Sequence, residues 1–122
     1  MAKRILVVDD SASVRNVAGI TLREAGYEVV EAANGREALG TLEAQRIHLI
    51  ISDVNMPVLD GISFLKEVKR HPSHRFTPVI MLTTESGADR KEEGRAAGAR
   101  AWIIKPFEPA VMLDAVSRLV MA

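Results

Sequence analysis

Short apolar runs alternate five times with longer amphipathic stretches along this chain. Four of the runs are nearly continuous in apolar residues, and they occupy residues 5–8, 49–51, 79–82 and 102–104. Continuous runs of this length are typical of parallel strands that are covered on both faces. The fifth run, at residues 27–32, interleaves Glu28 and Glu31 with valines, which suits a strand at the edge of the sheet with one side partly wet.

The stretches between the runs carry helical signals. In the first of them, apolar and small residues recur at helical spacing from Val14 to Ala25, and Gly26 is placed to end the helix. Further helices are expected near residues 36–44, 62–69 and 111–120. The stretch 86–99 has the length of a helix, but it offers mainly alanines between charges and three glycines.

Five strand-helix units with right-handed crossovers predict an α/β fold, in which a doubly wound parallel sheet has helices on both faces. With residues 27–32 at an edge, the strand order is expected to be 2-1-3-4-5, by analogy with known flavodoxin-like folds. The 122 residues fit one domain. We therefore expect a single domain over residues 1–122, without an output domain.

Charge and composition exclude several classes of function. Sixteen basic residues balance sixteen acidic ones, so no broad basic face is expected to hold nucleic acid or anionic lipid. The chain has no cysteine, which excludes disulfides, thiolate metal sites and thiol nucleophiles. The first apolar run, residues 5–8, is too short for a signal or membrane segment, and we expect a cytoplasmic protein.

Polar residues suited to phosphoryl chemistry follow or end four of the predicted strands, and they are Asp9 and Asp10, Asp53, Thr83 and Lys105. The carboxyl ends of parallel strands converge on one edge of the sheet, so these distant residues would share one pocket. In the order 2-1-3-4-5, the crevice lies between the first and third strands. Asp9, Asp10 and Asp53 would stand on either side of it.

Three carboxylates this close repel one another unless a cation neutralises them. Magnesium prefers such an all-oxygen site and usually takes one or two carboxylates together with phosphate oxygens. Lys105 adds a positive charge and Thr83 a hydroxyl donor, which are the parts that stabilise a transferring phosphoryl group. Asp53 is ionised at neutral pH and could attack phosphorus without a general base.

Each of these residues also has a purely structural interpretation. Asp9-Asp10-Ser11 could cap a helix, Asp53 could form a turn, Thr83-Thr84 before Ser86 could mark a helix start, and Lys105-Pro106 could be only a turn. All of them fall at the same edge of one predicted sheet. This coincidence favours the functional interpretation.

At these positions the chain closely resembles the receiver domain of bacterial response regulators, over essentially its whole length. The resemblance is carried by Asp9-Asp10, the stretch Asp-Val-Asn-Met-Pro-Val-Leu-Asp-Gly at residues 53–61, Thr83 and Lys105-Pro106, in the family's order and spacing. It implies that Asp53 accepts a phosphoryl group from a histidine kinase and that the bond between Lys105 and Pro106 is cis. The protein would then be a signalling protein that catalyses its own phosphorylation and dephosphorylation, not a metabolic enzyme.

The resemblance also implies how magnesium and the phosphoryl group are held. The metal ligands would be Asp10 and Asp53 directly, Asp9 mainly through water, and the main-chain carbonyl of Asn55. Thr83 and Lys105 would contact the phosphoryl oxygens.

Among stand-alone receivers, residues 83–86, 93–99 and 102–107 are most similar to those of the CheY-like chemotaxis regulators. This similarity implies a CheA-type kinase as phosphoryl donor and a flagellar motor switch protein as the target of the phosphorylated form. A phosphatase would be a further partner.

Trp102 stands where the family carries an aromatic switch residue, commonly Tyr or Phe. Drawing Thr83 toward a new phosphoryl group would free space behind it, and movement of the aromatic ring would reshape the face made by the fourth helix, fifth strand and fifth helix. An indole is larger than a phenol ring, so its inward rotamer would be harder to accommodate, and the alternative is a fixed, half-buried strand residue. Glu85 and Asn55 match positions that tune phosphoryl lifetime, and because both are polar we expect a transient phosphoryl group.

Other classes of function remain open. A receiver that only drains phosphoryl groups, or a binding module that is never phosphorylated, would share the fold, although the second usually lacks an acid or the lysine that this chain keeps. A flavin carrier is disfavoured, because residues 9–13 form an acidic turn without glycine. An aspartate-based phosphatase would normally carry its nucleophile after the first strand, whereas Asp53 follows the third.

Overall fold

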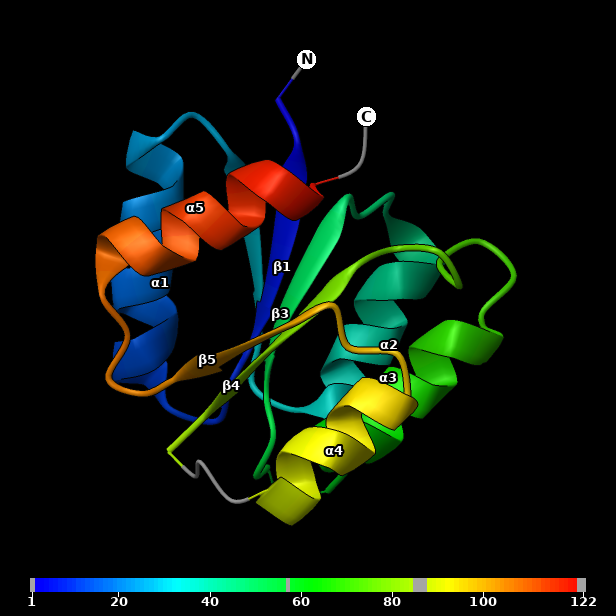
Figure 1. The fold of residues 1–122 in the computed structure, drawn as a ribbon. Helices are drawn as coiled ribbons and strands as arrows, with labels where there is room; N and C mark the ends of the chain where they lie inside the picture. The colour runs from blue at the N-terminus through cyan, green and yellow to red at the C-terminus, as the bar shows by residue number, and fades with distance from the viewer. Residues whose placement is uncertain (1, 57, 85–87, 121–122) are drawn as a thin grey trace.

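The computed structural model describes residues 2–56, 58–84 and 88–120, and within them five strands and five helices alternate along the chain (Figure 1). The strands are β1 (Arg4–Val8), β2 (Glu28–Ala32), β3 (Leu49–Asp53), β4 (Val79–Thr83) and β5 (Ala101–Ile104). The helices are α1 (Ala12–Glu24), α2 (Gly35–Ala44), α3 (Gly61–Arg70), α4 (Ala88–Ala96) and α5 (Pro109–Leu119). The predicted alternation of strand and helix is confirmed.

All five strands are parallel, and their order is β2-β1-β3-β4-β5, as predicted. The strand with alternating glutamates, β2, lies at one edge of the sheet. The register places Val8 opposite Ser52 and Thr83 opposite Ile104. The residues that follow β1 and β5 therefore emerge at the same edge as the ends of β3 and β4.

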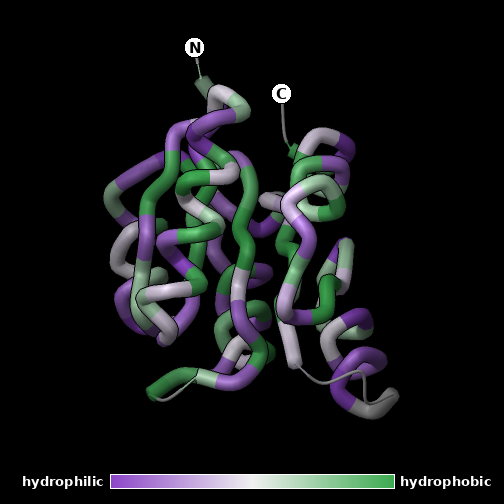
Figure 2. The backbone as a smooth tube through the Cα atoms, turned by 90° about the vertical axis from the view of Figure 1, so that its left-hand side faces the viewer, coloured by the Kyte–Doolittle hydropathy of each residue, from purple (hydrophilic) through white to green (hydrophobic). Residues whose placement is uncertain are grey.

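Helices cover both faces of the sheet, with α1 and α5 on one side and α2, α3 and α4 on the other (Figure 1). Each side has its own apolar core, one built against α1 and α5 and one against α2 and α3. Figure 2 shows the strands as hydrophobic segments inside a shell of more hydrophilic helices and turns. The three central strands β1, β3 and β4 are almost completely buried, which explains their continuous apolar runs.

Side chains fix the start of the first three helices. Ser11 caps α1 by accepting the N–H of Val14, and Asn34 caps α2 by accepting the N–H of Glu37 at 2.9 Å. Glu37 in turn accepts the N–H of Ala33 at 3.0 Å, so two N–H groups near the start of α2 are satisfied. Asp60 caps α3 by accepting the N–H groups of Ile62 and Ser63.

Local chemistry decides where the first helix ends and where the last one begins. Gly26 follows the end of α1 with a φ of +96°, as its predicted role as a terminator requires. The last helix begins at Pro109, two residues before the predicted start, because the fixed φ of proline suits the first turn, where its missing N–H costs nothing. Among the described residues, no helix combines the length and apolar character that crossing a membrane requires.

Candidate metal centre

Three aspartates meet at the carboxyl edge of the sheet. Asp9 and Asp10 follow β1 and Asp53 ends β3, and one carboxylate oxygen from each lies within 4.8 Å of the others. Asp9 and Asp53 are buried, whereas Asp10 is exposed. The structure therefore brings these three residues together across neighbouring strands, as the sequence predicted. Within the described part of the chain, no other group of three acidic or histidine side chains is this close.

Lys105 reaches into this acidic cluster from the end of β5. Its Nζ lies 2.7 Å from Oδ2 of Asp9 and 3.2 Å from Oδ1 of Asp53. Its main-chain N–H donates to the carbonyl of Thr83 at 2.7 Å, which fixes the start of the loop beside β4. The peptide bond to Pro106 is cis, as the resemblance implied.

The pKa values of two groups reflect the excess of negative charge. Burial raises the pKa of Asp53, the charge of Asp9 raises it further, and the ion pair with Lys105 and the N–H of Asn55 oppose the rise only in part. Burial alone would lower the pKa of Lys105, but its bonds to Asp9 and Asp53 outweigh burial and raise it. The lysine therefore stays charged, while the carboxylates still lack a full complement of positive charge.

A hard divalent cation fits this donor set. Asp9, Asp10 and Asp53 offer only carboxylate oxygens, two of them from buried side chains, with no nitrogen or sulfur ligand in the cluster. Oxygen ligands of this kind select magnesium or calcium over transition metals. The exposed Asp10 leaves one side of the cluster open to solvent, which suits magnesium because it keeps several of its waters.

Thr83 and Asn55 stand beside the cluster. Thr83 ends β4 and is completely buried. The main-chain N–H of Asn55 donates to Oδ1 of Asp53 at 3.4 Å, while its side chain is exposed. Gly61, the first residue of α3, packs so tightly on Asp53 that a Cβ there would overlap the aspartate's carbonyl oxygen. The start of α3 thus supports the main chain of Asp53.

Trp102 lies on β5, on the face of the sheet that α2 and α3 cover. It is half-buried, and it packs with Ala97 and Ala99 against the core that the sheet shares with α2 and α3. Its Nε1–H is buried and has no acceptor among the described residues. A cavity of about 170 Å³ beside the indole is lined by Lys91, Arg95, Ala99, Arg100, Ala101 and Trp102. Glu85, the second predicted tuning residue, lies outside the described residues.

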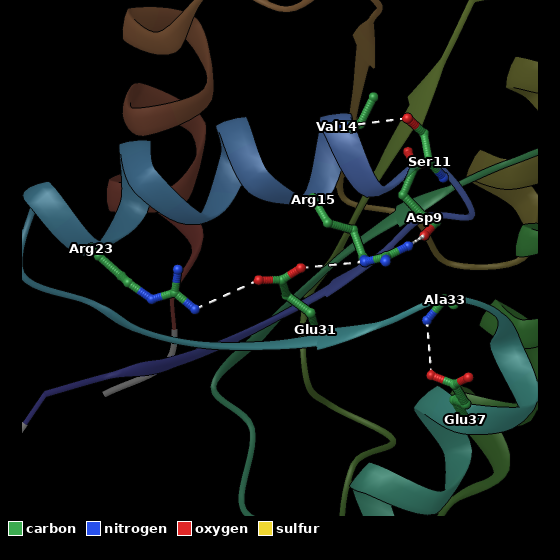
Figure 3. Close-up of polar contacts among 8 residues, drawn as sticks. All are labelled: Asp9, Ser11, Val14, Arg15, Arg23, Glu31, Ala33 and Glu37. Atoms are coloured by element: carbon green, nitrogen blue, oxygen red, sulfur yellow. Dashed lines mark hydrogen bonds and ion pairs between the residues drawn. The ribbon is translucent and has the colours of Figure 1, made fainter.

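The residue patterns did not single out Arg15, which donates from Nη1 to the main-chain oxygen of Asp9 at 2.6 Å (Figure 3). Ser11 also contacts Asp9, because its N–H donates to Oδ1 at 2.9 Å. The available signal was a basic residue in the first turns of the helix that follows β1 and its two aspartates. It is a weak one, because arginines are common on exposed helix faces.

Comparison with known proteins gives a consistent picture. The family model of the response regulator receiver domain matches residues 5–117. Chemotaxis protein CheY1 of Helicobacter pylori is 39% identical over 113 residues, which make up 91% of each protein. The crystal structure of chemotaxis protein CheY4 of Vibrio cholerae has a TM-score of 0.94 and 47% identity, and the match covers 98% of this chain and 100% of that one.

A third relative contains a magnesium ion. The receiver domain of sensor histidine kinase PA1611 from Pseudomonas aeruginosa is 32% identical, with a TM-score of 0.90 and 98% of both chains covered, and it has a magnesium ion coordinated in its active-site cleft. Some other relatives are longer proteins, and the chain spans about half of their length, 55% of one and 43% of another.

Proposed function

We propose, from the premise that this chain belongs to the response regulator receiver family, that it accepts a phosphoryl group on Asp53 and signals through the state of that residue. Receiver domains are signalling modules that take a phosphoryl group from histidine kinases and carry out this chemistry on themselves. The observation that carries the proposal is the position of Lys105, whose ammonium contacts both Asp9 and Asp53 in the acidic cluster.

The proposed reaction is an in-line displacement at phosphorus. A carboxylate oxygen of Asp53 attacks the phosphoryl group of a phosphohistidine, the new O–P bond forms, and the electron pair of the broken N–P bond stays on the imidazole. Lys105 and the hydroxyl of Thr83 contact the phosphoryl oxygens and offset their charge. Lys105 can do this because its raised pKa keeps it protonated.

Magnesium is part of the proposal. Asp10 and Asp53 would hold it directly, Asp9 mainly through water, and the main-chain carbonyl of Asn55 would complete the protein ligands. When bound, the ion supplies positive charge to the carboxylates and to the phosphoryl oxygens. The support is the all-oxygen donor set in this chain and the magnesium ion in the PA1611 receiver domain.

The proposed pathway is chemotaxis. The likeness to CheY1 of H. pylori and CheY4 of V. cholerae supports a stand-alone receiver without an output domain, acting in the cytoplasm. Its donor would be a CheA-type kinase and its target a flagellar motor switch protein. Binding would depend on a change in Trp102 and in the surface made by α4, β5 and α5. The polar Asn55 beside Asp53 supports a short lifetime of the phosphoryl group, and a phosphatase would shorten that lifetime further.

Intact-mass measurement after incubation with magnesium and acetyl phosphate tests the chemistry. We expect a gain of one phosphoryl group that requires magnesium and disappears in Asp53→Asn. Asp114→Asn is the matched control, because Asp114 is an exposed aspartate on α5 paired with Arg118, far along the chain from the cluster. It should be phosphorylated like the unaltered protein.

Fluorescence of Trp102, the only tryptophan, recorded in the same reaction tests the proposed switch. A change that follows phosphorylation supports movement at this residue, and an unchanged spectrum supports a fixed strand residue. No mass gain, under conditions that modify a known receiver, would replace the proposal with a binding module that is not phosphorylated. Phosphorylation without binding to a motor switch protein would favour a receiver that drains phosphoryl groups.

A further inference from the structure

An arginine on α1 is bound to the main chain of the acidic cluster. Arg15 donates from Nη1 to the carbonyl oxygen of Asp9 at 2.6 Å, and its Nε lies 3.3 Å from Oε1 of Glu31 on β2 (Figure 3). The Arg15 side chain is only 19% exposed, so water screens this ion pair less than it screens a surface pair. Arg15 therefore links the second strand to the end of the first.

The glutamate in this link is held from both sides. Arg23, near the end of α1, places Nη2 3.6 Å from Oε2 of Glu31, the oxygen that Arg15 does not contact (Figure 3). Gly19 lies between the two arginines on the helix, and a Cβ there would come within 2.9 Å of Nη1 of Arg23. The small residue gives the Arg23 guanidinium room beside Glu31, and Glu31 is thereby fixed as a partner for Arg15.

The other polar groups of Asp9 are also bound. Its N–H donates to Ala32 at 3.1 Å, Oδ1 accepts from Ser11 at 2.9 Å, and Oδ2 lies 2.7 Å from Nζ of Lys105. Arg15 supplies the remaining contact, at the carbonyl oxygen. These contacts come from β2, the turn, α1 and the residue that follows β5.

The bond to the Asp9 carbonyl also orients Asp10. The carbonyl of Asp9 and the N–H of Asp10 belong to one planar peptide unit, so a donor that fixes the first fixes the plane from which Asp10 departs. The Asp10 carboxylate is exposed, and among the described residues no hydrogen bond holds it. Its place within 4.8 Å of the other two carboxylates therefore depends on the main chain that carries it.

We propose that Arg15, held by Glu31, is a positioning residue for the metal centre. Arg15 fixes the plane of the Asp9–Asp10 peptide, and this holds the exposed Asp10 carboxylate near those of Asp9 and Asp53 before the cation binds. Binding of the cation then does not have to order the Asp10 carboxylate. This inference rests on the proposed function, because it concerns the same magnesium site. Groups that orient metal ligands in this way typically change metal affinity by 10- to 100-fold when they are removed.

Titration with magnesium chloride alone, followed by calorimetry, tests the inference on the full chain. Arg15→Met keeps much of the apolar stem and removes every donor, and we expect it to weaken magnesium binding by about 10-fold or more. Arg15→Lys, which keeps a charged donor, should restore part of the affinity. Glu31→Gln leaves the bond to Asp9 but loses the charge that holds Arg15, so its effect should be smaller.

Arg4→Met is the matched control. Arg4 also pairs with a glutamate of β2, Glu28, at 3.1 and 3.2 Å, but it lies on β1 itself, at the end of the strand away from the acidic cluster. Its removal should leave magnesium affinity unchanged. Equal weakening in Arg4→Met and Arg15→Met would overturn the inference, because the loss would then come from general loosening of the sheet edge.

The rate of phosphorylation by acetyl phosphate at different magnesium concentrations separates positioning from loss of structure. Arg15→Met should raise the magnesium concentration that gives half the maximal rate, and it should keep most of the maximal rate at saturating magnesium. A lower maximal rate with unchanged magnesium affinity would overturn the inference.

If the unaltered protein binds magnesium and is phosphorylated while Arg15→Met behaves identically, this inference fails alone. If the unaltered protein does neither, the proposed function fails and the inference fails with it.

Discussion

The neighbouring helices α3 and α4 lie on the same face of the sheet but are held in different ways. Five residues of α3 are buried, and they are Gly61, Ile62, Phe64, Leu65 and Val68. In α4, where burial is described for residues 90–96, only Gly94 is buried, and most of the others are charged. A Cβ on Gly94 would overlap Cζ3 of Trp102, so the backbone of α4 rests directly on the indole ring.

The difference in burial goes with a difference in the expected roles of the two helices. The first residue of α3 packs on the main chain of Asp53, so the deeply buried helix is also the one that supports the proposed phosphoryl acceptor. The helix with few buried side chains instead contacts the proposed switch residue, Trp102. Segments that bury little apolar surface open and shift at low free-energy cost. We therefore expect α4 to move more readily than α3.

The largest expected effect is the loss of an α3 core side chain. Phe64 is completely buried, and Phe64→Ala should lower the free energy of unfolding by about 3–5 kcal/mol through lost burial and a new cavity. Lys91→Ala, on the exposed face of α4, should change it by less than about 0.5 kcal/mol. Urea unfolding of both variants measures the contrast. Similar losses in the two would mean that α4 is as firmly packed as α3.

A pair of glycine substitutions tests the contact between α4 and the indole. Gly40 lies inside α2, and a Cβ added there would meet nothing within 4 Å, so Gly40→Ala should stabilise the protein by about 0.5–1 kcal/mol through helix propensity. At Gly94 the same gain is opposed by overlap with Trp102, and overpacking costs about 1–3 kcal/mol, which leaves a net loss of about 1 kcal/mol.

Two measurements check this pair. Urea unfolding gives the signs of the two changes, which should be opposite. Fluorescence of Trp102 should change in Gly94→Ala, because the ring must shift to admit the methyl group, and it should stay the same in Gly40→Ala. Stabilisation by both substitutions would show that α4 lies farther from the indole than the structure places it.

The sequence predicted the fold well because its signals are local. Continuous apolar runs identified the buried strands β1, β3 and β4, and the glutamates of β2 identified one edge of the sheet. The similar run at residues 102–104 was wrongly expected to be covered on both faces, because it forms β5 at the other edge, where only Ile103 is buried. The convergence of Asp9, Asp53 and Lys105 followed from topology alone, since parallel strands place their carboxyl ends together. The predicted roles of these residues in metal binding and phosphoryl transfer stay predictions.

The contacts that the sequence did not reveal are long-range packing contacts. The sequence did not indicate that Gly94 on the facing helix lies against the indole of Trp102, and no periodicity relates these two residues. The expectation that the inward rotamer of the indole is harder to accommodate stays a prediction. The bond from Arg15 to the Asp9 carbonyl depends on how α1 lies over β1 and β2. Patterns of apolar residues report which face is buried and not which polar atoms meet.

A third prediction concerns the cap of α3. Asp60 accepts bonds from the N–H groups of Ile62 and Ser63 and from the Ser63 hydroxyl, each at 3.0 Å. Asp60→Ala should lower the free energy of unfolding by about 1 kcal/mol, and Asp60→Asn, which can still cap, should lower it by less. Hydrogen exchange should show the loss in the first turn of α3 and leave α4 unchanged. Faster exchange in α4 alone would contradict the separate anchoring of the two helices.

Acid should reduce this contribution of Asp60. Burial tends to raise the pKa of Asp60, but the bonds from Ser63 and Ile62 and the charge of Arg90 outweigh burial and lower it. A carboxyl whose pKa is lower in the folded state stabilises the fold above its unfolded pKa, and this stabilisation is lost as pH falls through the folded pKa. The difference between Asp60→Ala and the unaltered protein should therefore shrink in acid.

The smallest expected effect lies beyond the other end of α3, where a histidine is buried. Nε2 of His74 accepts the N–H of Ile47 at 3.3 Å, so protonation there would break a buried hydrogen bond. Burial, followed by the charges of His71 and Arg46, lowers the pKa of His74. The unfolded chain therefore takes up this proton more readily than the folded protein, and stability should decrease as pH falls from about 6.5 toward the folded pKa.

Urea unfolding between neutral pH and pH of about 5.5 measures this decrease, and the range lies around the unperturbed histidine pKa. His74→Gln is the informative variant, because its amide oxygen can accept the N–H of Ile47 without titrating. Its stability should depend less on pH, and hydrogen exchange at the end of α3 should show the same weaker dependence. The described part of α4 has no histidine, so its exchange, corrected for the intrinsic effect of pH, should not follow the protonation of His74. An equal pH response in α3 and α4 would mean that the two helices open together, and the contrast between an anchored and a weakly held helix would then fail.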